Sequence, residues 1–408
     1  MHRPMEGVRV LEVAQFTFVP AAGAVLADWG ADIVKVEHAE RGDAQRGLSR
    51  ILGQAGGREG SSFYPIMEGP NRGKRSIGID LEKPESRPLL EKLVRASDVF
   101  LTNYLPAARE KLRIDLASIR QINPDIIYVS GTGFGGEGPD AEKGGYDSTA
   151  FWARGGSADG CTPPNAAAVT AMPAGAYGDS IGGMTIAGGI AAALYGRKVS
   201  GEPSALDISL LAVGAWANQF TVNLALLNGG PLPKVERRSE GRNPLTLTYR
   251  TSDDRWIQFS MLQPGRYWPE FCRHIGRDDL ITDERFATVE SLLANSLKAI
   301  EIVTEVIAGR TLAEWFDAFT GMQGQWAAVQ NSWELGNDEA LLANGRIVEV
   351  IDADGIARKL VANPVKFDEV PPALTRAPQF AEHTDEILTE LGYDEAQALD
   401  LKIAGAVT

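Results

Sequence analysis

Three consecutive segments near the N-terminus decide the fold: GVRVLEV at residues 7–13, PAAGAVLADW at residues 20–29 and ADIVKVE at residues 31–37. The first and third are short apolar runs rich in valine, a composition typical of strands buried on both faces. The middle segment opens with Pro20, and proline is favoured in the first turn of a helix. Strand, helix and strand in this order predict a βαβ unit with parallel strands.

The same alternation continues along the chain. Strands are predicted at residues 75–81, 98–101 and 125–130, and a helix at residues 84–97. This pattern predicts a doubly wound, mostly parallel α/β sheet with helices on both faces. The intervening residues 42–71 are rich in Gly, Ser and Arg, and we expect them to form a long loop over the ligand edge of the sheet.

A long helix is predicted at residues 181–197, with four glycines inside it. Each glycine costs about 0.8–1.0 kcal/mol of helix propensity relative to alanine, so we expect close packing against a ligand or another backbone to compensate. Residues 205–227 begin with a strand-like pattern and continue with a helical one.

The composition changes after Gly229 and Gly230. A hairpin is predicted at residues 245–250 and 256–260, and helices follow in a second, smaller α+β unit at residues 228–325. From Trp326 the pattern is mixed again, with strands predicted at 346–351 and 356–361 and a helix at 384–391. The predicted helices of the smaller unit span 267–275, 289–307 and 312–319.

Composition excludes several classes of function. The chain has 408 residues, a formal net charge of -14, two cysteines and 44% hydrophobic residues. The negative charge opposes binding to nucleic acid or anionic lipid, and no apolar run reaches the roughly 20 residues of a membrane-spanning helix. The four histidines and two cysteines show no metal-ligand spacing. We therefore expect a soluble, cytoplasmic protein without a metal, a nucleic-acid partner or a membrane partner.

Two glycine-containing segments are considered as phosphate-binding sites, and only the second remains a candidate. Residues 131–136 read GTGFGG and satisfy G-x-G-x-x-G, but Pro139 follows where a dinucleotide fingerprint would open a helix, so we expect a flexible glycine loop. Residues 71–76 read NRGKRS and place Arg72 and Lys74 at the start of a strand. Their cations suit a polyphosphate ligand, and a solvated, salt-bridged turn is an equally open alternative.

The third motif is Gly178-Asp179-Ser180, directly before the long helix. On spacing alone, Asp179 is most simply an N-cap. The helix dipole would also stabilise its carboxylate as an anion, which leaves it able to attack an activated carbonyl. Tyr146, in the motif Gly145-Tyr146-Asp147, has the simple interpretation of a buried aromatic at a loop end.

Together these segments resemble the family III CoA-transferases, the CaiB/BaiF group, which includes formyl-CoA, carnitine-CoA and bile-acid-CoA transferases and the related α-methylacyl-CoA racemases. The resemblance extends over nearly the whole chain. It rests on an ordered set of motifs: residues 7–12, 26–37, 71–76, 131–135, 145–147, 178–179 and 206–211.

The resemblance implies a fold and an assembly. Residues 1–227 are expected to form a large Rossmann-like CoA-binding domain, completed by the return segment 326–408. Residues 228–325 are expected to form the inserted small domain. Two chains would interlock as rings in a homodimer.

The resemblance also implies the site. Asp179 stands where the family has its catalytic aspartate, and Tyr146 matches a tyrosine that lines the active site. Coenzyme A, bound as acyl-CoA substrate, is expected to contact a set of polar residues: Gln15, His38, Arg72, Lys74, Asn103 and Lys111. The second substrate would be a free carboxylic acid.

Two departures concern the substrate. Thr17 replaces a glutamine that holds the acyl group in formyl-CoA transferase, and residues 238–243 contain only Gly241 where that enzyme has an oligoglycine flap. We therefore expect a substrate other than formyl or oxalate.

Three reaction classes are open to a chain with these residues. Transfer of CoA through an acylated Asp179 is favoured because tyrosine, with an ordinary pKa near 10, is a poor base for the α-proton exchange of a racemase. Family racemases have a histidine at the position of Tyr146. A catalytically silent CoA-binding protein would not need Asp179.

Overall fold

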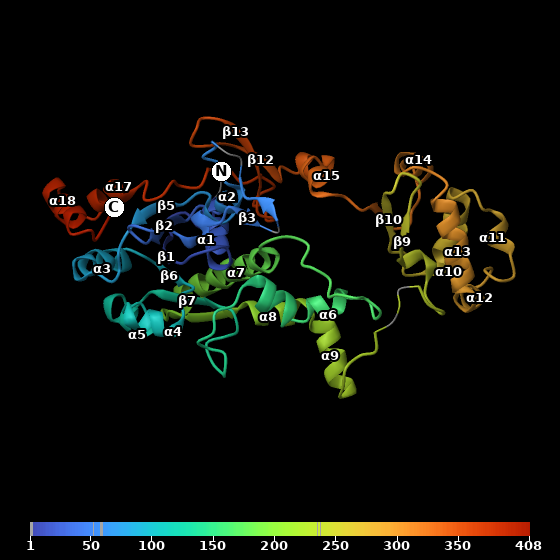
Figure 1. Cartoon of the computed structure of the whole chain (residues 1–408), viewed down its shortest axis with the longest axis horizontal. Helices are drawn as coiled ribbons and strands as arrows, with labels where there is room; N and C mark the ends of the chain where they lie inside the picture. The colour runs from blue at the N-terminus through green and yellow to red at the C-terminus, as the bar shows by residue number, and fades with distance from the viewer. Residues whose placement is uncertain (1–2, 52, 58–59, 235, 237) are drawn as a thin grey trace. The chain divides into compact units, whose positions relative to one another are not determined.

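The chain divides into two compact units (Figure 1). The computed structural model describes residues 3–51, 53–57, 60–234, 236 and 238–408. Unit 1 comprises Met1–Thr162, Ala168–Leu232 and Glu339–Thr408, and unit 2 comprises Pro163–Ala167 and Pro233–Asp338. Both ends of the chain therefore contribute to unit 1.

Unit 1 is built on a six-stranded parallel sheet with the order β5-β2-β1-β6-β7-β8. Its strands are β1 (Arg9–Val13), β2 (Asp32–Glu37), β5 (Arg75–Gly78), β6 (Val99–Thr102), β7 (Ile127–Thr132) and β8 (Ala205–Ser209). This confirms the predicted parallel α/β sheet. The strand order reverses between β1 and β6, and ligands of open α/β sheets bind at the carboxyl ends of the strands at such a point.

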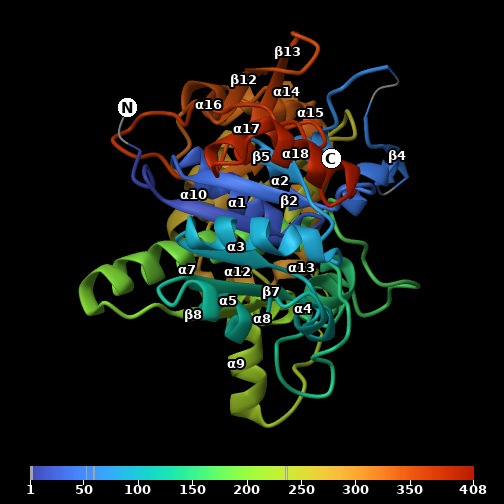
Figure 2. The same ribbon diagram turned by 90° about the vertical axis from the view of Figure 1, so that its left-hand side faces the viewer.

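Alternate side chains of the sheet face two separate cores. Val10 and Ile33 pack in the core with α1 (Phe18–Asp28) and α7 (Tyr177–Ser200). Leu11 lies in the other core, with α3 (Arg87–Arg95), α5 (Leu116–Ile122) and α17 (Thr384–Glu390). Figure 2 shows α3 and α5 on the near side of the strands. The predicted helices on both faces are confirmed.

The glycines of α7 allow it to approach α1 closely. A Cβ atom on Gly182 would lie 2.3 Å from Cε2 of Phe18, and one on Gly183 would lie 2.5 Å from Cβ of Ala21. The expected close packing is therefore confirmed, and its partner is the helix α1. This contact places the first turns of α1 and α7 beside each other.

The segment 42–71 contains more structure than the long loop that we expected. A 3₁₀ turn (Ala44–Gly47), the short strands β3 (Arg50–Ile51) and β4 (Gln54–Ala55) and the helix α2 (Pro65–Asn71) lie within it. Pro65 opens α2, as proline does at N1. Residues 52, 58 and 59 of the segment lie outside the described residues.

The remaining helices of the first part of unit 1 are shorter. They are α4 (Pro106–Lys111), α6 (Ser157–Cys161), α8 (Leu210–Ala217) and α9 (Gln219–Asn228), with a π-helical segment at Asp147–Ala153. Over the described residues, no single helix is long and apolar enough to cross a membrane. Helices α8 and α9 meet that test only as a pair, and they are bent by 76°.

Unit 2 is an α+β unit with its own core. Its antiparallel sheet has the order β11-β10-β9, formed by Trp326–Ala328, Trp256–Phe259 and Thr248–Arg250. The helices are α10 (Pro264–His274), α11 (Asp279–Thr282), α12 (Val289–Ala294), α13 (Ser296–Ile307), α14 (Leu312–Ala318) and α15 (Ser332–Gly336). The helix predicted at residues 289–307 is interrupted at Asn295, which is the C-cap of α12 and the N-cap of α13.

The unit boundaries differ from those expected at residues 228 and 326. Strand β11 pairs with β10, so residues 326–338 remain in unit 2 and unit 1 resumes at Glu339. Residues 228–232 remain in unit 1 with the end of α9. Backbone pairing between distant strands decides these limits, and local composition does not reveal it.

The return segment completes unit 1 without adding a strand to its main sheet. After α16 (Glu339–Ala343), the strands β12 (Ile347–Ile351) and β13 (Ala357–Val361) form an antiparallel hairpin. Helix α17 packs Ile387 and Leu388 into the core beneath the sheet, and α18 (Glu395–Ile403) precedes a bridge between Val407 and Ile79 beside β5.

Candidate functional site

A cavity of about 250 Å³ opens at the carboxyl ends of β1, β2, β5 and β6. Each of these strands ends in a residue or loop that lines it, with Gln15 after β1, His38 after β2, Asp80 after β5 and Tyr104 after β6. The cavity therefore lies at the edge where a doubly wound sheet binds its ligand. Two of the predicted nucleotide-binding residues, Gln15 and His38, line it.

Asn103 clamps the backbone of Gln15 across this edge. Its Oδ1 accepts a hydrogen bond from the Gln15 N–H at 3.0 Å, and its Nδ2 donates to the Gln15 carbonyl at 2.7 Å. The Gln15 side chain donates to the Tyr104 hydroxyl at 2.9 Å. Asn103 thus acts on the cavity by fixing Gln15.

Two basic side chains, His38 and Arg41, line the cavity together with the carboxylates Glu37, Asp80 and Glu82. The Nδ1 atom of His38 accepts hydrogen bonds from the backbone N–H groups of Glu40 and Arg41, so Nε2 carries the proton of the neutral ring. Arg41 lines the cavity as well. Lys111 is exposed at the end of α4 and pairs at 2.6 Å with Glu82, which also lines the cavity. Arg41 lies upstream of the basic segment 71–76, and it was not among the residues that we expected to contact CoA.

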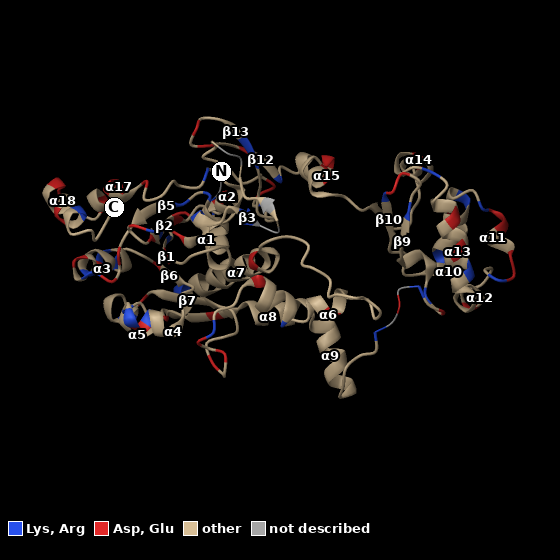
Figure 3. Cartoon of the chain, in the orientation of Figure 1, with Lys and Arg blue, Asp and Glu red and all other residues tan. Residues whose placement is uncertain are grey.

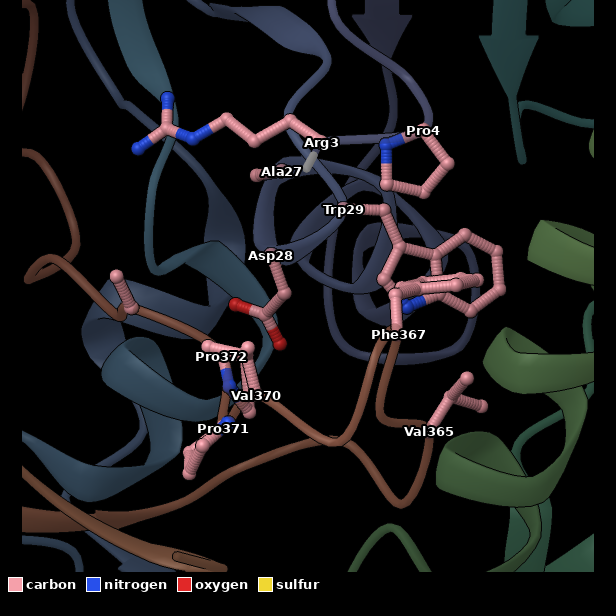
Figure 4. Close-up of a pocket in the computed structure, with 11 residues that line it drawn as sticks. Arg3, Pro4, Ala27, Asp28, Trp29, Val365, Phe367, Val370, Pro371 and Pro372 are labelled. Atoms are coloured by element: carbon pink, nitrogen blue, oxygen red, sulfur yellow. The ribbon is translucent and has the colours of Figure 1, made fainter. Parts of the chain in front are cut away.

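Arg72 does not lie in this cavity. It forms an ion pair with Asp28 at 2.6 Å, and both side chains are buried. Figure 4 shows Asp28 on the wall of a different, smaller cavity of about 30 Å³, between Trp29 and Pro371. Such a volume holds about one water molecule and is too small for a nucleotide.

Lys74 is completely buried. Its Nζ atom lies 2.7 Å from both carboxylate oxygens of Glu12 and 2.8 Å from the Pro20 carbonyl. Burial lowers the pKa of Lys74 to about 7, although Glu12 opposes this. The structure therefore gives Arg72 and Lys74 internal partners, in place of the phosphate contacts that we expected. The alternative of a solvated turn is also wrong, because both side chains are buried.

Asp179 stands in the first turn of α7, two residues after the first helical residue. The N-cap is Ala176, in the left-handed region with φ of 59°, so the N-cap interpretation of Asp179 is wrong. Its Oδ1 oxygen is buried and meets no hydrogen-bond donor among the described residues. Burial, and then the neighbouring charge of Asp147, raise the pKa of Asp179 to about 7. The expectation that the helix dipole keeps it ionised is thus outweighed by burial.

Asp147 is the residue that the sequence motif contained but to which we gave no role. Its carboxylate accepts the N–H of Ser148 at 2.7 Å, and its Oδ2 oxygen is buried without a donor among the described residues. Burial raises its pKa, while the N–H groups at the start of α7 lower it. Two carboxylates therefore share the N-terminus of α7.

Tyr146 is exposed and not a buried loop-end aromatic. Its side chain is 59% exposed, and its ring makes an edge contact with Phe16 at a centroid distance of 5.5 Å. The approach of two backbones sets its loop in place, because a Cβ atom on Gly133 would lie 2.8 Å from the Gly145 Cα. Gly131 and Gly133 therefore serve close packing, where we expected part of a flexible loop.

The turn between β1 and α1 connects the cavity with the catalytic candidates. Gln15 lines the cavity, Phe16 touches Tyr146, and Phe18 packs on Gly182, one turn after Asp179 in α7. The structure thus brings together Gln15, His38, Asn103 and Lys111 at one edge, with Tyr146 and Asp179 beyond the turn. Among the described residues, no group of three or more His, Cys, Asp or Glu side chains is arranged to hold a metal ion.

The fold and the site define an α/β protein with a cavity at the carboxyl edge of a doubly wound sheet and, beyond the turn at that edge, a carboxylate with one buried oxygen. Residues 5–384 match the model of "CoA-transferase family III". The chain belongs to this family, as the sequence motifs indicated, and it is a CoA-transferase.

Relatives match along nearly the entire chain. The cinnamoyl-CoA:phenyllactate CoA-transferase of Clostridium sporogenes is 31% identical over 403 residues, which cover 97% of this chain and 95% of that protein. The (R)-2-hydroxy-4-methylpentanoate CoA-transferase of Clostridioides difficile is 30% identical, with 98% of each chain covered. A crystal structure of a CAIB/BAIF family protein from Brucella suis superposes with a TM-score of 0.82 at 26% identity and covers 96% of this chain and 100% of its own.

Proposed function

We propose that the chain moves CoA from an acyl-CoA thioester to a free carboxylic acid, with Asp179 as the group that accepts the acyl unit. The observation that carries this proposal is the environment of Asp179. A carboxylate oxygen without a donor, at a helix N-terminus, is a nucleophile that has been desolvated and not neutralised by a cation. The buried Asp28 carboxylate, in contrast, has the Arg72 guanidinium as its partner.

The reaction balances without an external oxidant or metal. Ionised Asp179 attacks the thioester carbonyl, the C–S bond breaks, and an aspartyl anhydride and CoA thiolate form. The thiolate then attacks the aspartyl carbonyl, which releases the donor acid and leaves an aspartyl-CoA thioester. The acceptor carboxylate attacks that thioester, its C–S bond breaks, and a second anhydride, between the acceptor acid and Asp179, forms together with CoA thiolate. The thiolate then attacks the acceptor acyl carbonyl of this anhydride, which gives the product acyl-CoA and frees the Asp179 carboxylate. Backbone N–H groups at the start of α7 would stabilise the oxyanions.

The nucleotide of CoA would occupy the cavity at the ends of β1, β2, β5 and β6. Gln15 and His38 line this cavity, Asn103 fixes Gln15, and Lys111 carries a positive charge beside it. We propose these four residues, together with Arg41, as the CoA site. Arg72 and Lys74 would act only indirectly, by holding the elements on which the site stands.

The acids exchanged are proposed by analogy with the relatives. Two of them are named for cinnamoyl-CoA with phenyllactate and for (R)-2-hydroxy-4-methylpentanoate. Formyl-CoA:oxalate CoA-transferases are less similar, at 27% identity. We therefore propose carboxylic acids larger than formate and oxalate as substrates, which agrees with Thr17 in place of glutamine.

A racemase is the second reaction class, and the site does not favour it. Removal and return of an α-proton need two acid–base groups on opposite sides of the carbon. Burial and Asp147 raise the pKa of Asp179 to about 7, which would suit one of them. Tyr146 stands where a second would be needed, and it presents an exposed phenol in place of the histidine of the family's racemases.

The experiment is a mass-spectrometric panel of acceptor acids with succinyl-CoA, acetyl-CoA and longer acyl-CoA donors. Hydroxylamine or borohydride added after the active donor should label Asp179, and Asp179→Ala should abolish transfer while CoA still binds. Incubation in heavy water is the contrast, because a racemase introduces deuterium at the α-carbon without an acceptor. Rapid α-exchange together with no CoA transfer to any acid would refute the proposal.

We further propose that the chain works as a homodimer. Helix α9 projects from unit 1 in Figures 1 and 2, and none of its residues is buried. Phe220 is 80% exposed and Leu227 is 82% exposed, and the helix has no charged side chain (Figure 3). Such apolar surfaces mark protein interfaces. Light scattering that gives one 43.9 kDa species at micromolar concentration would contradict the dimer.

A reducing compartment, the cytoplasm, remains our proposal for its location. Cys161 is exposed and Cys272 is buried, and both are free thiols. Free thiols persist where thiol reductants keep them reduced. Localisation of a fluorescent fusion would test this.

A further inference from the structure

A cluster of buried charges lies beneath the turn at the end of β1. Lys35 of β2 is completely buried, and its Nζ atom lies 3.2 Å from Glu12 and 2.8 Å from Asp43. The Lys74 ammonium also contacts the Glu12 carboxylate, at 2.7 Å from both oxygens. Burying paired charges is commonly no more stabilising than burying apolar side chains. The cluster therefore calls for an explanation other than stability.

Asp43 is the point at which this cluster reaches the turn. One carboxylate oxygen, Oδ2, faces the Lys35 ammonium, and the other, Oδ1, accepts the backbone N–H of Phe16 at 3.0 Å. Asp43 is itself held in place, since its own N–H donates to Oε2 of Glu37 at 2.9 Å. It is 1% exposed. The same Oδ1 also accepts the N–H of Gln45 at 2.9 Å and caps the 3₁₀ turn Ala44–Gly47. A charged acceptor of fixed position thus binds, in the turn between β1 and α1, the N–H of one residue, Phe16.

That residue has an unusual backbone. Phe16 has a φ of 63°, in the left-handed region that non-glycine residues rarely occupy. Such conformations persist only where the surroundings hold them, and they cluster at functional sites. The residues on both sides are held as well, because Asn103 binds the backbone of Gln15 and the Thr17 hydroxyl donates to Gln45 at 2.8 Å.

We infer that Asp43 is a positioning residue for CoA transfer. It fixes Phe16 in the left-handed conformation. This conformation orients the Phe16 ring, which contacts Tyr146. It also sets the position of Gln15, on the cavity wall, relative to the first turn of α7. The inference rests on the proposed function, because the turn is useful only if the CoA cavity and Asp179 serve one reaction. Asp43 itself touches no substrate in this role.

If Asp43 only stabilised the fold, its substitution would affect activity no more than the substitution of another buried, paired carboxylate. Asp28, at the other end of α1, is also a buried carboxylate paired with a buried cation, Arg72, and it makes no contact with the turn. Asp28→Asn therefore removes a comparable buried charge and serves as the matched control. If stability alone mattered, Asp43 and Asp28 variants of equal melting temperature would have equal activity.

The experiment compares Asp43→Ala, Asp43→Asn and Asp28→Asn in the full chain, with the donor and acceptor found active in the panel. We expect Asp43→Ala to lower kcat about 100-fold, the size of effect that a displacement of about 1 Å can have. Asp43→Asn keeps an oxygen that can accept the Phe16 N–H, so it should recover most of that loss. Asp28→Asn should stay within about twofold of the wild-type kcat, even at a similar loss of melting temperature.

Calorimetric titration with CoA itself separates binding from turnover. In Asp43→Ala the affinity for CoA should change less than kcat, because Arg41 and His38 remain. Wild-type kcat in Asp43→Ala, or equal losses of kcat in Asp43→Ala and Asp28→Asn at equal melting temperature, would overturn the inference. Full activity of Asp179→Ala would instead overturn the aspartyl mechanism. The transfer rates of the Asp43 and Asp28 variants would still show whether the turn at Phe16 affects catalysis.

Discussion

Replacement of Asp179 by asparagine should make the protein more stable while it abolishes transfer. Burial, and then Asp147, raise the pKa of Asp179 from 3.8 to about 7, so ionising this carboxyl costs the folded state free energy. Each tenfold change in proton affinity is about 1.4 kcal/mol, which sets an upper limit of about 4 kcal/mol for this cost. The side chain is only partly enclosed, so we expect roughly half of the limit, about 2 kcal/mol.

The sign of the pH dependence follows from the raised pKa. The neutral carboxyl stabilises the folded state fully below the unfolded pKa of 3.8, and this stabilisation is lost as the pH rises through about 7. Asparagine does not ionise, so the advantage of Asp179→Asn should be complete at pH 8. At pH 5 about two fifths of it should remain.

The assay is thermal unfolding of the wild type and Asp179→Asn at pH 5 and pH 8, where we expect a rise of several degrees at pH 8 and a smaller one at pH 5. Asp28→Asn is the control, and it should lower the melting temperature, because it leaves Arg72 buried without its partner. An Asp179→Asn variant that melts at or below the wild-type temperature at pH 8 would refute the reasoning. A gain of equal size at both pH values would do so as well.

Three further predictions concern single residues. Arg72→Ala should lower the free energy of unfolding by about 3 kcal/mol, since it strands Asp28 in the interior, and the remaining folded protein should bind CoA normally by calorimetry. His38→Ala should weaken CoA binding about tenfold with an unchanged melting temperature, because the ring is at the cavity wall; unchanged affinity would remove His38 from the site. Gly182→Ala should lower both melting temperature and kcat, since the new Cβ atom would meet Phe18 at 2.3 Å; a variant with wild-type values of both would show that α1 and α7 can separate freely.

Local sequence signals were sufficient for the sheet. The valine-rich runs at 7–13 and 31–37 and the proline at position 20 depend only on neighbours along the chain, and the structure has strands and a helix there. The family motifs likewise indicated a CoA-transferase, because they follow one another in a fixed order along the chain. The unit boundary at 326 could not be found in this way, because β11 belongs with β10 through backbone pairing over nearly seventy residues.

For the site, too, the sequence indicated some features and only the structure showed others. The motif around Asp179 indicated the catalytic candidate, and the family resemblance indicated Gln15 and His38, which line one cavity at the carboxyl ends of the strands. A local run of basic residues did not show where its side chains point. Lys74 meets Glu12, 62 residues away, and Arg72 meets Asp28, 44 residues away.

The sequence by itself thus determined the α/β sheet and the family, since periodicity and motif order are properties of the chain, and it supplied Asp179 as the proposed nucleophile. Only the tertiary structure decided that Arg72 and Lys74 are interior cations, that Arg41 borders the cavity, and that Asp147 and Asp179 share one helix end. The physical reason is that a charge acquires its role from its burial and its nearest opposite or like charge. Those neighbours come from elements far apart in the chain, and folding alone brings them together.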